Sequence, residues 1–234
     1  MERFKNRYRH ELKYLADDRD IVLLGSELGT VMKLDAHNKD GPYRIRSVYF
    51  DDSMDSAMQE NLDGVSPRAK FRIRTYNDNA DSIFLEKKIK DHDMTGKKSC
   101  LITRQECEAL LNRKPVRVTP ENSPDRELLM EFKALVNRAG FVPKIVVEYE
   151  RTAYVCREGN VRITFDRNIA SSRYVRQFFS RGMPKRPVMP SGKHILEVKY
   201  DEFLPSYIKK SINTGKMDRA TFSKYVMCRH FTAG

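Results

Sequence analysis

The sequence predicts an α+β fold built around a large antiparallel β-sheet. Three observations lead to this expectation. Strand-like and helix-like segments alternate along the 234 residues, most strands pair as hairpins, and several connections are too short for parallel crossovers. The chain shows no internal repeat, low-complexity tract or dividing linker, so we expect a single domain over residues 1–234.

The N-terminal part is expected to alternate strand and helix. Tyr8–Leu15 is predicted as a strand, and Arg44–Phe50 as another because it is rich in β-branched and aromatic residues. The helix between them covers about residues 18 to 33, where apolar side chains recur at helical spacing. These are Ile21, Leu24, Leu28 and Met32. A short helix over residues 55–62 ends at Gly64.

The next segment predicts a hairpin, a strand and a helix. Arg68–Tyr76 and Ser82–Lys90 are strands joined by a turn rich in Asn and Asp, Asn77–Asp81. A strand over Lys97–Thr103 then leads into a helix over residues 104–112.

The strongest helix start lies at Ser123-Pro124-Asp125, with Pro124 at the first helical position and Gly140 after the last turn. A second hairpin follows, with strands over Lys144–Cys156 and Val161–Ile169.

The C-terminal part begins with residues 171–192, which are rich in Arg, Pro and Ser and are predicted as an irregular loop. His194–Asp201 is the last predicted strand. Two helices are expected after it, over residues 205–213 and 219–230.

Basic residues exceed acidic ones, with 44 Lys and Arg against 32 Asp and Glu and a net charge of +12. Such a surplus favours a polyanionic partner, which could be nucleic acid, an anionic membrane, polyphosphate or a nucleotide. There is no P-loop motif, and the five histidines show no metal-ligand spacing. The basic stretch Arg173–Arg186 is interpreted as a charged loop, so we expect no nucleic-acid partner.

The four cysteines are scattered without a CxxC pair, which is typical of reduced thiols rather than a zinc site or a disulfide framework. The N-terminus lacks the apolar core of a secretion signal, and no apolar run is long enough to span a bilayer. We therefore expect a cytoplasmic protein.

The placement of the bases is more informative than their number, because every second side chain of a strand lies on one face. In strand 68–76 one face carries Arg68, Lys70, Arg72 and Arg74, and the other carries Ala69, Phe71, Ile73 and Thr75. Four more strands have similarly charged faces: Arg7, Arg9, Glu11 and Lys13; Glu86, Lys88 and Lys90; Arg162, Thr164 and Asp166; Glu197 and Lys199. A solvated face would explain any one strand. If the sheet closes, five such faces line an interior suited to a polyanion.

Eight short motifs occur in order between residue 9 and about residue 225: RHELKY, VYFDD, KFRIRTY, FLEKK, YERTAY, RITFD, LEVKY and SKY. In this order the chain resembles the VTC domain, the polyphosphate polymerase domain of the CYTH-like triphosphate tunnel metalloenzymes. The resemblance implies a closed eight-stranded antiparallel β-barrel tunnel with helices packed outside. It also implies transfer of the ATP γ-phosphate to inorganic polyphosphate with Mn²⁺ or Mg²⁺, in a stand-alone member of bacterial type.

Matched motif by motif, the resemblance also implies the site residues. Arg72, Arg74 and Lys224 would be catalytic, and Glu197 would bind the metal. The other matched bases would bind phosphate: Lys13, Lys88, Arg151 and Arg162. Lys98 and Lys199 are expected to bind phosphate with them.

Two positions depart from the family pattern. Asn61 and Leu101 stand where basic residues are usual, and Arg68 or Lys70 could replace the first. For the second, Lys98 is the nearby candidate.

Structural roles stay open for other matched residues. Glu197 could pair with Lys199, and Arg151 with a nearby glutamate, Glu148 or Glu150. Lys224 could be a solvated helix residue. Asp51-Asp52 is interpreted as a strand-end or helix-capping pair rather than a metal site.

Two alternative functions remain beside the polymerase. The first is a CYTH-type tripolyphosphatase, although Arg9 replaces the first carboxylate of the E-x-E-x-K strand that is usual there. The second is a non-catalytic module that binds polyphosphate and could serve a membrane-protein partner.

Overall fold

The computed structural model describes residues 8–116, 126–214, 217–219 and 221–232. The predicted helix start at Ser123-Pro124-Asp125 lies outside this part, and the helix itself is α4, Glu127–Arg138. The described chain combines helices with one antiparallel sheet, so the predicted α+β class is confirmed. None of its helices is long and apolar enough to cross a membrane.

The sheet has ten strands rather than the eight predicted, and all of its strand pairs are antiparallel. The strands are β1 (Arg9–Asp17), β2 (Lys33–Leu34), β3 (Tyr43–Asp51), β4 (Arg68–Tyr76), β5 (Ile83–Asp91), β6 (Met94–Ile102), β7 (Val142–Cys156), β8 (Val161–Ser172), β9 (Arg186–Pro187) and β10 (Lys193–Tyr200). The two additional strands, β2 and β9, have two residues each, too few to produce a period in the sequence. β9 lies within the predicted irregular loop.

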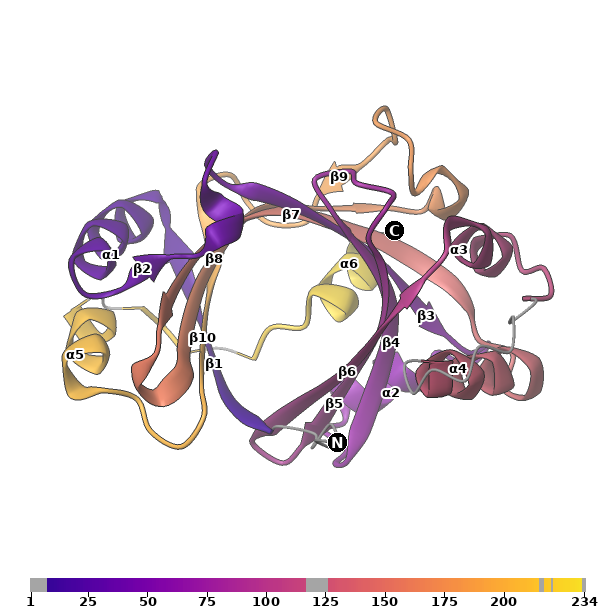
Figure 1. The fold of residues 1–234 in the computed structure, drawn as a ribbon, viewed down its shortest axis with the longest axis horizontal. Coiled ribbons are helices and arrows are strands. Elements are labelled where there is room, and N and C mark those ends of the chain that lie inside the picture. Colours follow the sequence, from indigo (N-terminus) through magenta and orange to yellow (C-terminus); the bar gives the residue numbers. More distant parts are fainter. Residues whose placement is uncertain (1–7, 117–125, 215–216, 220, 233–234) are drawn as a thin grey trace.

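Eight of the strands form a ring of pairings. Their order is β7-β3-β4-β5-β6-β1-β10-β8, and β8 also pairs with β7. The shortest strand pairing in the ring joins β1 and β6, which share only the pairs Arg9↔Thr95 and His10↔Met94. Irregularities at Tyr49/Phe50 and at Glu148/Glu150 shift the register of β7 with its neighbours, and such bulges bend strands. Figure 1 looks along this ring.

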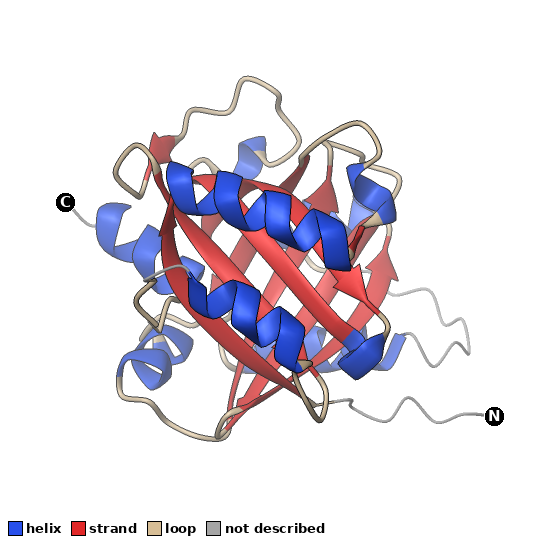
Figure 2. Ribbon diagram, turned by 90° about the vertical axis from the view of Figure 1, so that its left-hand side faces the viewer, coloured by secondary structure: helices blue, strands red, loops and turns tan. Residues whose placement is uncertain are grey.

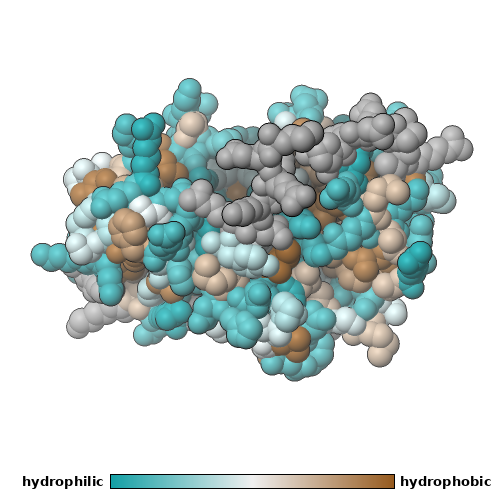
Figure 3. All heavy atoms as spheres, turned by 60° about the horizontal axis from the view of Figure 1, so that its bottom comes forward, coloured by the Kyte–Doolittle hydropathy of each residue, from teal (hydrophilic) through white to brown (hydrophobic). Residues whose placement is uncertain are grey.

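Four helices cover the outer face of the ring. α1 (Asp18–Val31) and α5 (Ser206–Thr214) lie over β8 and β10, as Figure 2 shows, and bury side chains such as Leu24 and Ile208. α3 (Arg104–Leu111) and α4 cover β3, β4, β5 and β6. Capping boxes at Asp17 and Thr103 begin α1 and α3 by satisfying their first backbone N–H groups. Hydrophilic residues dominate the face in Figure 3.

α6 (Lys224–Thr232) differs from the other helices because it packs on the inner face. The inward-facing residues of β3 and β7 are largely apolar, and α6 covers them with Tyr225, Val226 and Cys228. The prediction that helices pack outside is therefore wrong for α6. The apolar part of the inner face needs a cover, and the C-terminal helix provides it.

Candidate functional site

The remaining inner face is charged. Outward residues of β4 such as Phe71 and Ile73 are buried beneath α4, so Lys70, Arg72 and Arg74 point inward. The bases that meet on this face and at its edge are Lys13, Lys70, Arg72, Arg74, Lys88, Lys97, Arg151, Arg162, Lys199 and Lys224. The carboxylates among them are Glu11, Glu86, Asp166 and Glu197.

Glu11 and Glu197 form the first charged group with lysines of three strands. Lys88 Nζ lies 2.8 Å from both carboxylate oxygens of Glu11, and Lys13 Nζ lies 3.0 Å from one of them. Lys199 Nζ is 2.7 Å from Glu197, so the pair that was kept as an alternative role for Glu197 is present. Burial alone would raise the pKa of each carboxyl, but the lysines more than offset this and lower both pKa values. Both groups are therefore held as carboxylates.

Glu86 is the centre of the second group and is almost fully buried. Arg72 Nε donates to its Oε2 at 2.7 Å, Arg74 Nη1 lies 3.6 Å from the same atom, and Lys97 Nζ lies 3.0 Å from Oε1. Burial opposes ionisation of Glu86, yet the two arginines and Lys97 hold its pKa well below the ordinary value. Arg72 also donates to the hydroxyl of Tyr49 at 3.0 Å.

Asp166 holds the third group together. Arg151 donates to both of its carboxylate oxygens, at 2.6 and 2.8 Å, and Lys224 Nζ lies 2.6 Å from Oδ2. Burial would lower the pKa of Lys224, but Asp166 raises it, so the lysine stays charged. The alternatives of a solvated Lys224 and of an Arg151 pair with Glu148 or Glu150 are wrong. Glu148 instead pairs with Arg46 and Lys185.

Two further bases lie at the margins of these groups. Arg162 pairs with Asp35 and donates to the Tyr43 hydroxyl at 3.1 Å. Lys70 donates to Asn61 and to Ser223 Oγ, the latter at 2.9 Å. Burial, and then the charges of Lys88, Lys13 and Arg68, lower the pKa of Lys70 to about 7.

The structure places Lys98 away from this face. Lys98 pairs with Lys87 in the register of β5 and β6, and both lie on the outer side, where Lys87 contacts Glu131 of α4. Lys97 points inward instead, on the same face as Leu101. Strand parity could have identified Lys97. Lys97 lies four residues from Leu101 and therefore on the same face of β6, whereas Lys98 lies three residues from it and on the opposite face.

The resemblance to the family gave no role to three carboxylates that hold the bases in place, which are Glu11, Glu86 and Asp166. Strand parity already placed each of them on a charged face, so the signal was present. Their partners could not be assigned, because side chains meet across strands only when the register is known.

The donor set for a divalent metal ion is small. Within the described residues, no group of three or more His, Cys, Asp or Glu side chains could hold an ion. Glu197 and Glu11 supply hard carboxylate oxygens, and Thr164, opposite Glu197 in the β8–β10 register, has a buried hydroxyl oxygen with no described hydrogen-bond partner. These donors fit Mn²⁺ or Mg²⁺ when phosphate oxygens and water complete the shell.

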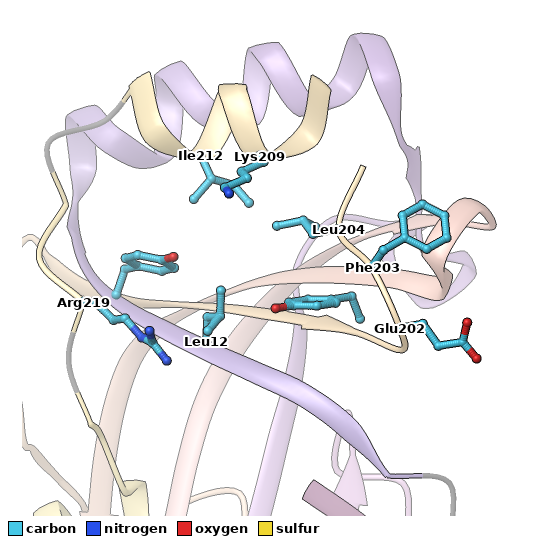
Figure 4. Close-up of a pocket in the computed structure, with 9 residues that line it drawn as sticks. Leu12, Glu202, Phe203, Leu204, Lys209, Ile212 and Arg219 are labelled. Atoms are coloured by element: carbon cyan, nitrogen blue, oxygen red, sulfur yellow. The ribbon is translucent and has the colours of Figure 1, made fainter. Parts of the chain in front are cut away.

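A separate cavity of about 450 Å³ lies on the outer side of the sheet, between β1, β10 and α5. Figure 4 shows Leu12 on the strand below and Lys209 and Ile212 on the helix above. None of the predicted site residues lines it, so the charged inner face remains the candidate site.

The chain is similar to one protein family and, at low sequence identity, to several solved structures. Residues 8–232 match the family described as the VTC domain, and no curated protein matches the chain. A Bacillus halodurans protein, solved as a candidate adenylate cyclase, has a TM-score of 0.55 at 11% identity, with 93% of this chain and 95% of that chain covered. The PH1819 protein of Pyrococcus horikoshii has a TM-score of 0.44 at 16% identity, with 91% and 94% covered. The Mimivirus capping enzyme triphosphatase has a TM-score of 0.34 at 9% identity, with 88% and 84% covered.

Among these three structures, the first alone exceeds a TM-score of 0.5, and at 11% identity it supports a shared fold and nothing more. The family match is of a different kind, because it extends over nearly all of the 234 residues. The chain therefore belongs to the VTC domain family.

Proposed function

We propose that this protein is an ATP-dependent polyphosphate polymerase. The observation that carries the proposal is the composition of the inner face, where ten basic side chains meet four carboxylates. Each carboxylate is shared between two or three bases, so positive charge remains in excess. A polyphosphate chain supplies the missing negative charge, and walls of low dielectric strengthen each contact relative to open water.

In the proposed reaction, a terminal oxygen of the polyphosphate chain attacks the γ-phosphorus of ATP. A new P–O bond forms, the bond from the γ-phosphorus to the β,γ-bridging oxygen breaks, and ADP leaves with that oxygen. Phosphoryl transfer depends on in-line positioning and charge neutralisation more than on covalent chemistry by the protein. Arg72 and Arg74 would neutralise the transferred group, and Lys224 would do so from α6.

The other bases would hold the phosphates on either side of the reacting group. Arginine suits paired phosphate oxygens through its planar fork, and lysine acts as a point charge. The phosphate-binding set is Lys13, Lys88, Lys97, Arg151, Arg162 and Lys199. Lys97 replaces Lys98 in this set because Lys98 lies on the outer side.

Glu197, with Glu11 beside it, would hold a divalent ion, which supplies additional positive charge to the phosphates when bound. We expect Glu197→Ala to abolish metal-dependent turnover and to retain part of the affinity for polyphosphate. Glu131→Ala, which removes a carboxylate on the outer side, is the matched control and should leave turnover unchanged. Turnover that survives in the Glu197 variant would contradict the metal assignment.

The decisive test is incubation of the purified protein with ATP and Mn²⁺, followed by gel analysis of polyphosphate and quantification of ADP. The polymerase is expected to give long polymer with stoichiometric ADP, and Arg72→Ala/Arg74→Ala should abolish it. Release of orthophosphate without polymer would identify a tripolyphosphatase instead.

A polyphosphate-binding module is the second candidate, favoured by the apolar or neutral residues at Leu101 and Asn61. Asn61 accepts a hydrogen bond from Lys70 rather than contributing a charge. The expected result for such a module is tight polyphosphate binding without turnover, lost in the double arginine variant.

A further inference from the structure

One end of the charged inner face is apolar and aromatic. Tyr76 ends β4, and Phe84 lies near the start of β5. Phe84 pairs with Arg74 on one side and with Leu101 of β6 on the other. Along each of these strands, inward-facing charges therefore give way to inward-facing apolar groups at the same end.

Two residues from other segments complete this end. The rings of Tyr76 and Phe84 lie 6.1 Å apart, and Tyr43 of β3 lies 6.1 Å from Tyr76. His37, from the 3-10 turn Ala36–Asn38, lies 5.8 Å from Tyr43 and 6.4 Å from Tyr76. We call these residues the aromatic rim: His37, Tyr43, Tyr76, Phe84 and Leu101.

Four residues of the aromatic rim are accessible from solvent, and Tyr43 is buried behind them. Leu101 is 58% exposed and the His37 side chain is 72% exposed, while Tyr76 and Phe84 are partly exposed. At the same end of these strands, outward-facing residues such as Ile73 and Leu85 are buried in the core under the helices. Exposed apolar side chains that are grouped beside a charged wall are typical of a ligand site rather than a core.

Positive charge begins directly beside the aromatic rim. The Arg74 guanidinium carbon lies 5.9 Å from the centre of the Tyr76 ring, and Arg162 donates to the Tyr43 hydroxyl. Lys97 is four residues from Leu101 on the same face of β6, a span of about 13 Å in an extended strand. A ligand with an aromatic group at one end and a phosphate tail of this length fits the arrangement.

We propose that the aromatic rim binds the base of a nucleoside triphosphate whose phosphates extend along the wall toward Arg74 and Lys97. Bases stack on aromatic side chains whatever their sequence identity. The inference rests on the proposed function and deepens it, because it assigns the nucleotide, rather than inorganic polyphosphate, to this end of the inner face. It also gives Leu101 a role: an apolar residue there contacts the base.

The test compares the affinities of ATP and inorganic tripolyphosphate, which share the phosphate chain and differ in the nucleoside. Calorimetry would be done on the full chain and on Tyr76→Ala, Phe84→Ala and Tyr76→Phe. Each alanine variant is expected to weaken ATP binding about tenfold, and to leave tripolyphosphate binding within about twofold of the wild type. Tyr76→Phe keeps the ring and should bind ATP as the wild type does.

Phe231→Ala is the matched control. Phe231 is 58% exposed on α6, near Arg229, which is anchored on Asp55 beyond the opposite end of β3. Its loss should change neither affinity.

The inference would be overturned if the alanine variants lost affinity for both ligands equally, or lost no affinity for ATP. The assignment of phosphates to the charged inner face would not be affected by either result. If the wild type binds neither ligand, the proposed function fails, and the base site fails with it. In that case Arg72→Ala/Arg74→Ala would also be without effect, which distinguishes the two failures.

Discussion

At the scale of single residues, each inward carboxylate is a shared counter-ion. Asp166 serves Arg151 and Lys224 from two different elements, and Glu86 serves two arginines and Lys97. Removing a buried partner of this kind leaves an unpaired charge, which costs about 3–5 kcal/mol. The carboxylates thus keep the bases in position and neutralise part of their positive charge. The positive charge that remains is available to bind a polyanion.

The two adjacent lysines of β6 provide a matched test of which face binds phosphate. Lys97 points inward and is half exposed, and Lys98 lies on the outer side. We expect Lys97→Ala to weaken polyphosphate binding about fivefold, since an exposed ionic contact is worth up to about 1 kcal/mol. Lys98→Ala should leave binding unchanged. Isothermal titration with a defined polyphosphate measures both, and the reverse ranking would contradict the assignment of the inner face.

The lowered pKa of Lys70 predicts that the affinity for a polyanion depends on pH. Its pKa is lowered to about 7 by burial and then by Lys88, Lys13 and Arg68, so much of Lys70 is neutral at pH 8 in the free protein. A bound polyanion favours the charged form, and binding should therefore take up a proton. We expect the affinity to fall as the pH rises above about 7.

The lowered pKa of Lys70 also makes the free energy of unfolding of the ligand-free protein depend on pH. Because the pKa of Lys70 is lower in the folded state than the unfolded value of about 10.4, the unfolded chain binds more protons between these values. The contribution of Lys70 to the free energy of unfolding therefore rises with pH from about 7 to about 10. Titration calorimetry in two buffers of different ionisation enthalpy measures the proton uptake. Lys70→Arg should reduce this uptake without abolishing it, because burial lowers the pKa of Lys88 to about 7 as well. Identical uptake in the variant would contradict the role of Lys70.

Strand parity predicted a large part of the inner face at this scale. Lys70, Arg72 and Arg74 were expected on one face of β4, and they are. The pairing of Arg151 with Asp166 was not predicted, because it depends on the register of β7 with β8 across an irregularity near Glu150. Register is set by contacts distant in sequence, which a strand pattern does not contain.

At the scale of elements, α6 is tied to the end of β3 and the start of α2 (Ser56–Leu62). The Tyr225 hydroxyl donates to Asp51 Oδ2 at 2.6 Å, and Arg229 Nη1 donates to Asp55 at 2.8 Å. Asp51 also accepts from backbone N–H groups of α2, at Ala57 and Met58, which confirms its predicted capping role. Lys224 precedes Tyr225, so these contacts determine where Lys224 meets Asp166.

We expect Tyr225→Phe to loosen this attachment. Tyr225 is almost fully buried and its hydroxyl bonds to a charged group, so the loss should lower the free energy of unfolding by about 1.5–3 kcal/mol. The thiol of Cys228, which α6 buries against the inner face of the sheet, should react faster with a thiol reagent in the native variant. Denaturant titration and labelling of Cys228 measure the two effects.

Tyr154→Phe is the matched control for α6. Its hydroxyl makes a 3.4 Å hydrogen bond to the carbonyl of Gly25 in α1, on the outer face. The change should have little effect on stability and none on the labelling of Cys228. Equal labelling rates in both variants would contradict the attachment through Asp51.

The helices and strands themselves were predictable where they are long. β4 has the predicted bounds, and α1 and α3 differ from the prediction by a residue or two. The location of α6 was not predictable. The amphipathic pattern of a helix shows that one of its faces is buried, but not whether that face packs on the inside or the outside of a closed sheet. The two-residue strands depend on pairing alone.

At the scale of the whole molecule, closure of the ring was predicted from family resemblance and not from the residues. Neighbouring strands such as β4, β5 and β6 follow from local hairpins, but β1 meets β10 across most of the chain and meets β6 across 86 residues, from Arg9 to Thr95. Such contacts depend on the complete fold. The same closure brings like charges from seven strands together, and their repulsion opposes the compact state.

A polyanion should therefore stabilise the protein as well as bind to it. Inorganic tripolyphosphate at one hundred times its dissociation constant is expected to add about 2.7 kcal/mol to the free energy of unfolding, by mass action. The gain should shrink as salt screens the charges. Thermal melts at low and high salt measure both effects, and Arg72→Ala/Arg74→Ala should reduce the gain. A melting temperature that does not respond to tripolyphosphate at low salt would contradict a phosphate-binding inner face, because nothing that binds only the folded state can leave its stability unchanged.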